Sequence, residues 1–215
     1  MISKRAVIYP NVRLGKNCTI EDFVIIGVPP RGFKKGELET VIGDNAIIRS
    51  HTVIYAGNKI GNYFQTGNKA NVRELNEIGD NVSIGTLSVV EHHVKIGKDV
   101  RIHTQAFIPE YTILEDKCWV GPNVVITNAK YPNSPNAKDE LKGVHIKKGA
   151  IIGANSTIVP GIVVGENVLI GAGSVVTKNI PPNMVVIGNP ARVIKNISEL
   201  PYHIIDLKNQ TRQGC

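Results

Sequence analysis

Apolar residues recur every six positions along most of the chain. Between Ile42 and Ile126 an aliphatic residue occupies every position of this step, except that Thr66 stands at one of them. The step is also present before and after this stretch, at Ile8, Leu14, Ile20, Ile26, Ile146, Ile152, Ile158, Val164, Ile170 and Val176. Two residues before many of these positions stands a second apolar or small residue, as at Ala46, Thr52, Ala70, Val82, Ser88, Val94, Ala106, Thr112 and Cys118.

A period of six predicts short strands joined by corners. The two apolar positions of each hexad lie two residues apart and point the same way, which is the alternation of a strand and not of a helix. Each hexad then forms one strand and one corner, and three hexads close a triangular coil. The repeat predicts an all-β fold, a parallel β-helix of about eight coils that rises about 39 Å at the spacing of neighbouring strands. A β-sandwich has no reason to keep so regular a step.

Two segments break the repeat and predict loops that leave the prism. They are residues 28–40, VPPRGFKKGELET, and residues 127–145, TNAKYPNSPNAKDELKGVH. Loops on a rigid scaffold often carry ligand contacts. The repeat ends near residue 180, so the chain divides into a β-helix over 1–180 and a C-terminal tail over 181–215. Within the tail, residues 198–210 predict a short amphipathic helix.

Composition narrows the range of functions. The net charge is +7, which favours anionic ligands, but aromatic residues make up only 5% and form no basic stripe of the kind that binds nucleic acid. No apolar run is long enough to span a membrane and the start, MISKRAVIYP, has no secretory signal. Cys18, Cys118 and Cys215 cannot all pair, which favours free thiols and a cytoplasmic protein.

The C-terminal coils resemble those of the hexapeptide-repeat transferase family. The matching elements are IGA at 152–154, IGAGSVVTK at 170–178, IPP at 180–182 and GNPARVIK at 188–195. The resemblance covers residues 6–195 and implies a left-handed β-helix, a homotrimer with active sites between neighbouring prisms, and an acyltransferase that uses acetyl-CoA as co-substrate. No resident metal is implied.

The same resemblance implies a set of coenzyme A contacts. Ala154 and Ala172 match positions whose backbone meets the pantetheine arm, and Thr177 and Lys178 match positions near the adenine. Arg192 and Lys195 match the basic tail near the phosphates. Small corner residues let backbone groups reach an amide-bearing arm, and basic side chains bind phosphate. A second interpretation stays open: the small residues only permit tight turns, as we prefer for Gly153 and Gly171, and the basic residues are ordinary surface charge.

Among the six histidines, His103 is the candidate nearest the chemistry. Counting corners places it in one column with Arg49, Gly67, Gly85, Gly121, Gly153 and Gly171. It stands three coils from Gly171, about 14 Å away. His103 and Gln105 are therefore candidate catalytic residues, although a solvated corner histidine is an equally acceptable interpretation. His92 belongs to another corner, in line with Glu110 and Asn128, and the sequence leaves open whether that column faces a neighbour's cofactor.

The residues at the start of the long loop indicate whether the acceptor is a hydroxyl or an amine. Galactoside- and xenobiotic-type enzymes of the family carry a histidine near its start, where this chain has Asn128, Lys130 and Tyr131. We take Asn128 and Tyr131 as candidate substrate-binding residues. The segment CWVGPNVVITNAKYPNSP resembles N-acetyltransferases that act on nucleotide-linked amino sugars, and a sugar amine can attack in its neutral form. The predicted function is N-acetylation of a UDP- or dTDP-linked amino sugar.

Three alternatives stay open at this point. The first is an O-acetyltransferase acting on a sugar or another small hydroxyl acceptor. The second is a γ-type carbonic anhydrase on the same fold, which needs three zinc-binding histidines across a subunit interface, whereas the one close pair here is His92–His93. The third is a non-enzymatic trimeric scaffold, which would not bind coenzyme A.

Overall fold

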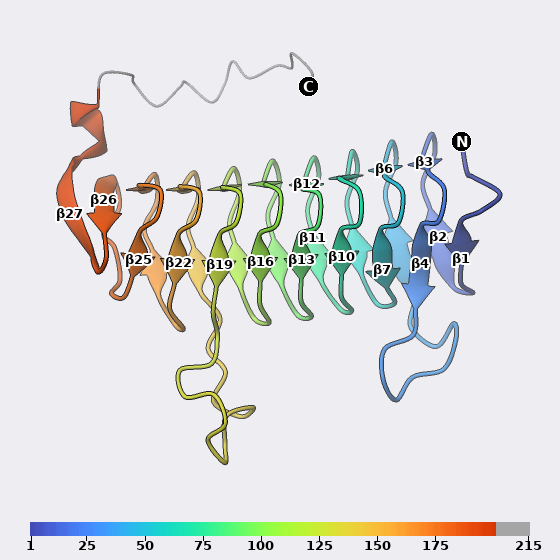
Figure 1. Cartoon of the computed structure of the whole chain (residues 1–215). Coiled ribbons are helices and arrows are strands. Elements are labelled where there is room, and N and C mark those ends of the chain that lie inside the picture. The colour runs from blue at the N-terminus through green and yellow to red at the C-terminus, as the bar shows by residue number, and fades with distance from the viewer. Residues whose placement is uncertain (201–215) are drawn as a thin grey trace.

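The computed structural model describes residues 1–200 as a left-handed parallel β-helix (Figure 1). Short strands follow one another around a triangular prism and stack into three parallel sheets, here named I, II and III in chain order. Two loops hang from the prism, and a hairpin closes its C-terminal end. The one helical element within residues 1–200 is the 3-10 helix η1, Ile197–Glu199.

Sheet I holds every third strand from the start of the chain. Its nine strands are β1 (Val7–Ile8), β4 (Ile25–Val28), β7 (Val53–Tyr55), β10 (Asn71–Val72), β13 (Val89–Val90), β16 (Phe107–Ile108), β19 (Val125–Ile126), β22 (Thr157–Ile158) and β25 (Val175–Val176). The eight strands of sheet II are β2 (Val12–Leu14), β5 (Thr40–Ile42), β8 (Lys59–Ile60), β11 (Glu77–Ile78), β14 (Lys95–Ile96), β17 (Ile113–Leu114), β20 (His145–Ile146) and β23 (Val163–Val164).

Sheet III completes the triangle and carries the hairpin. Its ten strands are β3 (Thr19–Ile20), β6 (Ile47–Ile48), β9 (Gln65–Thr66), β12 (Ser83–Ile84), β15 (Arg101–Ile102), β18 (Trp119–Val120), β21 (Ile151–Ile152), β24 (Leu169–Ile170), β26 (Met184–Gly188) and β27 (Ala191–Asn196). All strands pair in parallel except β27, which runs antiparallel to β26.

The core is the stack of hexad residues that the sequence predicts. Every one of the positions from Ile42 to Ile126 is buried, with relative exposure of 5% or less. Thr66 is accommodated because its hydroxyl accepts a hydrogen bond from the Arg49 amide and contacts the Thr52 hydroxyl. Ile8 differs: it is 38% exposed, because the first coil has no neighbour beneath it.

The corners hold their shape through left-handed backbone at fixed positions. His93 and Gln105, like Asn81 and Asp99, have φ between 55° and 61°. Asparagine and glycine tolerate this region best, so larger residues there are held by the coil, whose backbone pairs with the coils on either side. The side chains of such residues lie on the outside of the prism. The corner geometry therefore decides which polar residues are presented to ligands.

Both loops leave the prism at the edge between sheets I and II (Figure 1). The first connects β4 to β5 and the second connects β19 to β20. The long loop is closed at its foot, where the Lys142 amide donates to the Asn128 carbonyl at 2.8 Å. The two loops lie five coils apart, so the same edge between them carries several exposed corners.

The C-terminal tail begins as strand and not as helix. β26 continues sheet III next to β24, and β27 folds back on it. The hydrophobic side chains of Ile187, Val193 and Ile194 are exposed on this hairpin. The helix predicted over 198–210 lies for the most part outside the described residues. No helix within residues 1–200 is long and apolar enough to cross a membrane.

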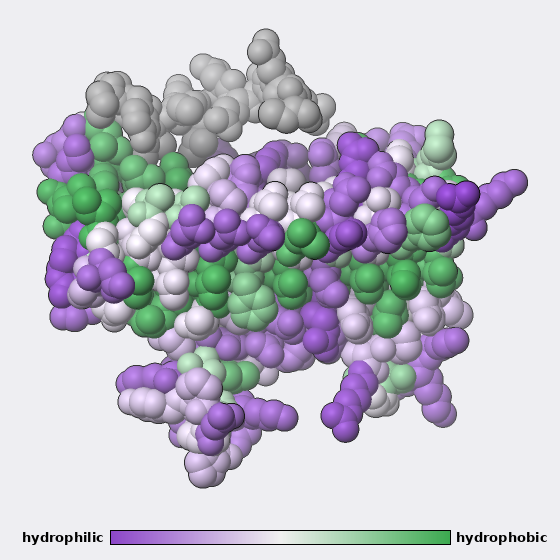
Figure 2. All heavy atoms as spheres, in the orientation of Figure 1, coloured by the Kyte–Doolittle hydropathy of each residue, from purple (hydrophilic) through white to green (hydrophobic). Residues whose placement is uncertain are grey.

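The three outer faces differ in polarity. The outward residues of sheet I stack as Val7, Ile25, Val53, Asn71, Val89, Phe107, Val125, Thr157 and Val175. Figure 2 shows this face with an apolar band along the strands. Sheet II is mixed, because Lys59, Glu77, Lys95 and His145 alternate there with Val41, Ile113 and Val163. Sheet I is therefore the face that gains most from being covered by another chain.

Phe64 tests how tightly the prism interior is packed, because its side chain is fully buried. Phe64→Ala should lower the free energy of unfolding by about 3–5 kcal/mol, since it leaves a cavity among stacked aliphatic side chains. The matched control is Phe23→Ala, because Phe23 is 48% exposed. Guanidinium denaturation of both variants provides the measurement. Equal losses would show that the interior is not close-packed at Phe64.

Candidate active site

The edge between sheets III and I carries the predicted corner column. His103, Gly121, Gly153 and Gly171 follow β15, β18, β21 and β24 in register. Each amide donates to the next coil: His103 to the Val120 carbonyl at 2.9 Å and Gly153 to the Ile170 carbonyl at 2.8 Å. The order of the column is therefore as the hexad step predicts.

Packing between coils explains the glycines of this column. A Cβ on Gly153 would lie 2.5 Å from the amide nitrogen of Ala172, which real structures do not tolerate. A Cβ on Gly121 would lie 3.0 Å from the Trp119 ring. The interpretation of Gly153 as a structural corner residue is therefore sufficient. Ala154 is half-buried and Ala172 exposed, so these two residues present short side chains and backbone at the surface of the edge.

His103 lies against an aromatic ring that the sequence analysis did not single out. The centroids of its imidazole and of the Trp119 indole are 4.4 Å apart. Burial, and then the charge of Arg101, hold the pKa of His103 below its usual value. The imidazole is therefore neutral at pH 7 and can donate or accept a hydrogen bond. Trp119 was detectable in principle, because it stands eighteen residues after the outward-facing Arg101, in register with it.

The structure divides the predicted site residues between two edges. His103, Gln105, Ala154 and Ala172 lie at the III–I edge, and Arg192 lies opposite Ile187 on the hairpin that ends this edge. Lys195, on the same strand, lies opposite Val185. Asn128, Tyr131, Thr177 and Lys178 follow strands of sheet I and lie at the I–II edge. Within one chain, sheet I separates the two groups, so the structure does not bring them together.

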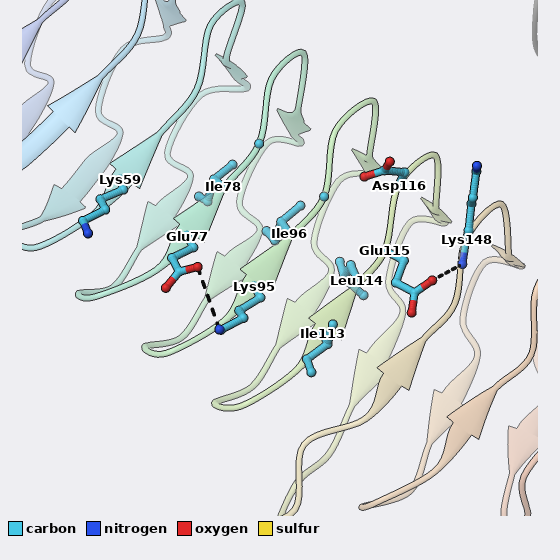
Figure 3. Close-up of a pocket in the computed structure, with 12 residues that line it drawn as sticks. Lys59, Glu77, Ile78, Lys95, Ile96, Ile113, Leu114, Glu115, Asp116 and Lys148 are labelled. Carbon is cyan, nitrogen blue, oxygen red and sulfur yellow. Dashed lines mark hydrogen bonds and ion pairs between the residues drawn. The ribbon is translucent and has the colours of Figure 1, made fainter.

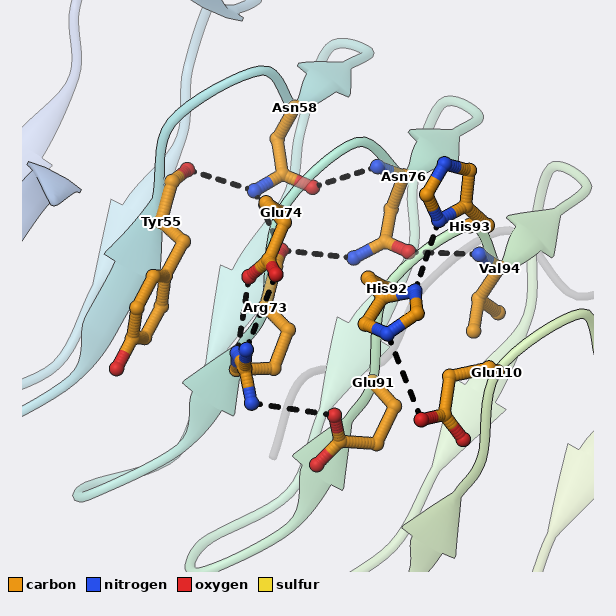
Figure 4. Close-up of polar contacts among 10 residues, drawn as sticks. All are labelled: Tyr55, Asn58, Arg73, Glu74, Asn76, Glu91, His92, His93, Val94 and Glu110. Carbon is orange, nitrogen blue, oxygen red and sulfur yellow. Dashed lines mark hydrogen bonds and ion pairs between the residues drawn. The ribbon is translucent and has the colours of Figure 1, made fainter. Parts of the chain in front are cut away.

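A polar cluster occupies the I–II edge between the two loops (Figure 4). We name it the I–II cluster; its members are Arg73, Glu74, Glu91, His92, His93, Glu110 and Asn128. Arg73 binds both oxygens of Glu74 at 2.9 and 3.0 Å and reaches Glu91 at 3.4 Å. The guanidinium also lies 4.9 Å from the centre of the Tyr55 ring. The edge thus holds one arginine and three carboxylates close together.

The second half of the I–II cluster links the two histidines to the long loop. His92 Nε2 lies 3.4 Å from Glu110 Oε1, and the Nδ1 atoms of His92 and His93 are 2.8 Å apart. Asn128, at the start of the loop, donates through Nδ2 to Glu110 Oε2 at 2.6 Å. The stacking of His92, Glu110 and Asn128 was predicted from the repeat. The sequence did not show that Asn128 orients Glu110, because that depends on side-chain conformation.

Two buried asparagines hold these corners in place. Asn58 Oδ1 accepts from the Asn76 amide at 3.0 Å, and Asn76 Oδ1 accepts from the Val94 amide at 2.7 Å. Their side-chain nitrogens both donate to the Arg73 carbonyl. Each amide therefore satisfies the backbone of a neighbouring coil, as buried polar groups require. The I–II cluster stands on a rigid support.

Burial shapes the titration of the carboxylates. It raises the pKa of Glu91, although the charge of Arg73 opposes the shift. Burial is also the largest single influence on the pKa of Glu74 and raises it, but the hydrogen bonds from Arg73, a backbone hydrogen bond and the nearby positive charge together leave that pKa below its usual value. The two acids differ because Glu74 faces the guanidinium through both oxygens.

A third surface feature lies on sheet II, away from both edges. It is an open depression of about 740 Å³ lined by Lys59, Glu77, Lys95, Ile113, Glu115 and Lys148 among others (Figure 3). Its charges alternate in sign: Lys95 Nζ lies 3.8 Å from Glu77 Oε2, and the Lys148 amide donates to Glu115 Oε2. None of the predicted site residues lines it.

Residues 1–200 contain no group of three or more histidine, cysteine or acidic residues arranged to hold a metal ion.

Comparison with known proteins places this architecture. A family model described as bacterial transferase hexapeptide, with six repeats, matches residues 77–110 and 143–178. The galactoside O-acetyltransferase of Escherichia coli K12 is 37% identical over 174 residues, which are 78% of this chain and 68% of that protein. The chain belongs to the bacterial hexapeptide-repeat transferase family. The family's repeat model spans sheets I, II and III, including the corners of His92 and Ala172.

Other relatives of this hexapeptide-repeat chain carry different activities in their names. The bifunctional protein GlmU of Clostridioides difficile is 29% identical over 91% of the chain, which spans 39% of that protein's length. The galactoside O-acetyltransferase of Lactococcus lactis is 33% identical over 60% of the chain and 59% of its own length. A solved maltose O-acetyltransferase from Clostridium difficile, with 33% identity, covers 54% of this chain and 66% of its own, with a TM-score of 0.48.

His103 offers a direct test of the III–I edge. Trp119→Ala should raise the pKa of His103 towards its ordinary value, because it exposes the imidazole to water. Arg101→Gln should raise it as well, by removing a like charge. NMR titration of the His103 ring protons provides the measurement, with Trp119→Phe as the control that keeps an aromatic cover. A pKa that does not change in Trp119→Ala would contradict the stacking of the two rings.

Proposed function

We propose that the chain is an acetyl-CoA-dependent acetyltransferase that acylates the amino group of a nucleotide-linked (UDP or dTDP) amino sugar. Family membership supports transfer of an acyl group, and relatives in this family include proteins named as O- and N-acetyltransferases. The observation that carries the choice of an amine acceptor is the I–II cluster.

The charge of the I–II cluster suits an amine. Glu74 is compensated by Arg73, whereas Glu110 contacts only the neutral amide of Asn128 and the imidazole of His92 among the described residues. Glu91 shares the same arginine at the longer distance of 3.4 Å. An amino sugar arrives mainly as an ammonium ion near neutral pH, and surplus negative charge attracts it. A hydroxyl acceptor gains nothing from that charge.

The III–I edge suits the co-substrate. At Gly153 the stacked coils leave no room for a Cβ, and Ala154 and Ala172 add only methyl groups to the surface. Backbone N–H and C=O groups there can approach the amides of a pantetheine arm. Arg192 and Lys195 on the hairpin would bind the phosphates. Acetyl-CoA supplies an activated acetyl group as a thioester; the chain's part is to hold that group near His103 and to keep the arm extended along the column.

A trimer would unite the two edges. Sheet I has the most apolar outer face and lies between them. If sheet I of each chain faces a common threefold axis, the III–I edge of one chain meets the I–II edge of the next. The cofactor column and His103 would then come from one protomer, and the I–II cluster, the long loop and Lys178 from its neighbour. This arrangement explains why neither edge contains all of the predicted site residues.

The reaction follows from this arrangement. The ammonium ion first loses one proton to water, and the neutral amine then attacks the thioester carbonyl, so that a C–N bond forms and the C–S bond breaks. The amine loses one proton and the departing coenzyme A thiolate gains one, so the products are the N-acetyl sugar and free coenzyme A. The neutral His103 imidazole can hydrogen-bond to the acceptor or to the acyl oxygen. Gln105 is exposed on the same corner and can help to orient the acceptor.

An O-acetyltransferase is the second candidate. The relatives from Escherichia coli and Lactococcus lactis carry the name galactoside O-acetyltransferase. A hydroxyl of high pKa requires a general base in reach, and the histidines of the I–II cluster could supply one. The acidic surroundings still favour the amine.

A panel of acceptors separates these functions. Incubation with acetyl-CoA and UDP- or dTDP-linked amino sugars should release free thiol, and the corresponding hydroxyl sugars should give rates lower by about 10²-fold or more, because they lack the amine that the acidic edge attracts. The measurement is thiol release, with mass spectrometry of the product. Faster turnover of a hydroxyl sugar than of any amino sugar would reverse the choice between N- and O-acylation.

Mixed trimers test whether the site is shared between chains. Ala172→Trp should obstruct the cofactor edge, and deletion of residues 131–141 should remove the acceptor loop while leaving its foot, which the Lys142 amide closes on the Asn128 carbonyl. Each variant alone should be inactive. A trimer that contains both has one interface at which two intact edges meet, so it should regain about one third of wild-type turnover per trimer.

The two variants are co-expressed with different tags and purified through both. As the control for the purification, each variant is also expressed alone with both tags, so that trimers of a single variant pass through the same two steps. Sedimentation of the wild type must show a trimer. Folded mixed trimers without activity would place the whole site on a single chain.

A further inference from the structure

The outer face of sheet I carries one side-chain amide among aliphatic residues. Asn71, in β10, lies in register between Val53 of β7 and Val89 of β13. Its strand is the fourth of the nine in the sheet, so the amide lies well inside the apolar band and not at one end of it. Asparagine is depleted in strands, where β-branched residues fit best. Strand formation alone therefore does not explain Asn71.

The Asn71 amide is not satisfied within its own chain. Its Oδ1 is buried and has no hydrogen-bond partner, and its side-chain nitrogen makes no hydrogen bond within residues 1–200. The other buried side-chain oxygens without a partner there belong to Thr112, inside the prism, and to Ser134, in the long loop. Buried polar groups in native proteins normally find partners, which indicates that the partner of Asn71 lies outside the chain.

Aliphatic side chains by themselves would fix the relative height of neighbouring chains only weakly. The strands of sheet I repeat about every 4.8 Å along the prism, and the outward residues Val53, Val89 and Val125 present the same side chain at three heights. A chain displaced by one coil would still bury aliphatic surface against its neighbours. Displaced contacts do not close a ring, so a further residue is needed to reject them.

We propose that the three Asn71 side chains of a trimer hydrogen-bond to one another around the threefold axis and so fix the height at which the prisms associate. Each amide has both a donor and an acceptor, so the N–H of one chain can donate to the C=O of the next until the ring closes. The inference rests on the trimer described under the proposed function, but not on the reaction. The partner is a second and a third copy of this chain.

The ring rejects other heights because an amide without a partner is costly. In a chain displaced by one coil, Asn71 would lie against Val53 or Val89 of its neighbours, and neither its N–H nor its C=O would be paired. The loss of hydrogen bonding in a dry interface then opposes the displaced assembly. A buried asparagine in a coiled coil selects register and strand number by the same physical effect.

The coil that carries Asn71 also has complementary charges at its two corners. Lys69, at the III–I edge, is exposed and forms no ion pair within the described residues. At the I–II edge, Glu74 and Glu91 share the single guanidinium of Arg73, which leaves that corner acidic. In the trimer the III–I edge of one chain meets the I–II edge of the next. The Lys69 ammonium would then face the acidic corner at the height that aligns the three Asn71 amides.

The relative height matters for the shared site. Displacement by one coil moves the cofactor edge of one chain by about 4.8 Å along the I–II cluster of its neighbour. Reacting groups tolerate far less, since a misplacement of about 1 Å can cost about 10²-fold in rate. Asn71 is therefore a positioning residue: it acts through the assembly of the trimer and touches no substrate.

The first experiment observes the ring in the wild-type protein and needs no turnover. The side-chain N–H protons of Asn71 should exchange with water at least about tenfold more slowly than those of Asn17, an exposed asparagine at the II–III edge, because hydrogen bonding and burial protect them. Asparagine labelled with nitrogen-15 provides the NMR signals, and Asn71→Val assigns them. Equal exchange of the two side chains would overturn the ring.

Asn71→Val tests whether the amide fixes the height. Threefold symmetry requires one set of methyl signals for Val53 and Val89 in the wild type. The variant should still associate, but should show several sets, together with larger open assemblies in sedimentation. The control is Thr157→Val, which replaces another polar residue of the same outward column and should keep one set. A single set of signals and a uniform trimer in Asn71→Val would contradict the inference.

Asn71→Asp tests the position of the side chain through pH. Three carboxylates around one axis repel, so the protein concentration at which half of the trimer dissociates should rise about tenfold or more at about pH 7.5. The repulsion also raises the pKa of these carboxyl groups in the trimer above that in the monomer. Trimer stability should therefore be regained as the pH falls through that raised pKa, towards about pH 5.

Gln65→Glu is the matched control for charge. Gln65 is exposed on sheet III, on the same coil as Asn71, so this variant adds the same charge at the same height but away from the axis. It should dissociate like the wild type at both pH values. An Asn71→Asp trimer that is as stable as the Gln65→Glu trimer at about pH 7.5 would overturn the ring.

Turnover separates this inference from the proposed function. With the acceptor found by the panel, Asn71→Val should lower kcat about tenfold or more and leave the KM for acetyl-CoA within about twofold, because the aligned interfaces that remain are intact. Absence of turnover with every acceptor, together with a protected Asn71 amide and split valine signals in Asn71→Val, would contradict only the proposed function. A wild-type monomer that acetylates amino sugars would overturn the ring and leave the activity standing.

Discussion

The pairing of each coil with the next is the constraint on which the whole molecule depends. A strand of two or three residues has no stability of its own, and these strands exist only because backbone groups bond to the coils above and below while one aliphatic side chain per hexad enters the interior. Any residue that interrupts the interior step must find its hydrogen bonds elsewhere, as Thr66 does with Thr52 and Arg49. Insertions are tolerated only at the corners between strands, which is why both loops leave the prism at a corner.

The same constraint builds the candidate site. Strict stacking turns residues eighteen positions apart into neighbours, so His92, Glu110 and the residues next to them become a column without any long-range folding event. It also fixes corner backbone in the left-handed region, at His93 among others, and thereby presents side chains outward from a support that does not yield. Rigid presentation of this kind suits a binding or catalytic site, whose groups must keep their positions to within a fraction of an ångström.

In the proposed trimer, sheet I would give the two edges their functional relation. Its apolar outer face separates the cofactor column from the I–II cluster within one chain, and association through that face would bring the edges of neighbouring chains together. On this view covering apolar surface and completing the site are one event. The family's acyl chemistry would then depend on assembly for a physical reason: one prism cannot present both edges to the same substrate.

The six-residue step by itself determined the fold class, the buried positions, both loops and the order of the corner columns, because a parallel β-helix converts sequence period directly into spatial register. Resemblance added the family. Only the tertiary structure decided that the tail continues as a hairpin and that Trp119 covers His103. Side-chain conformation decided the contacts within the I–II cluster. The contact of His92 with His93 and the hydrogen bond from Asn128 to Glu110 depend on side-chain rotamers at the corners, which a periodic pattern does not encode.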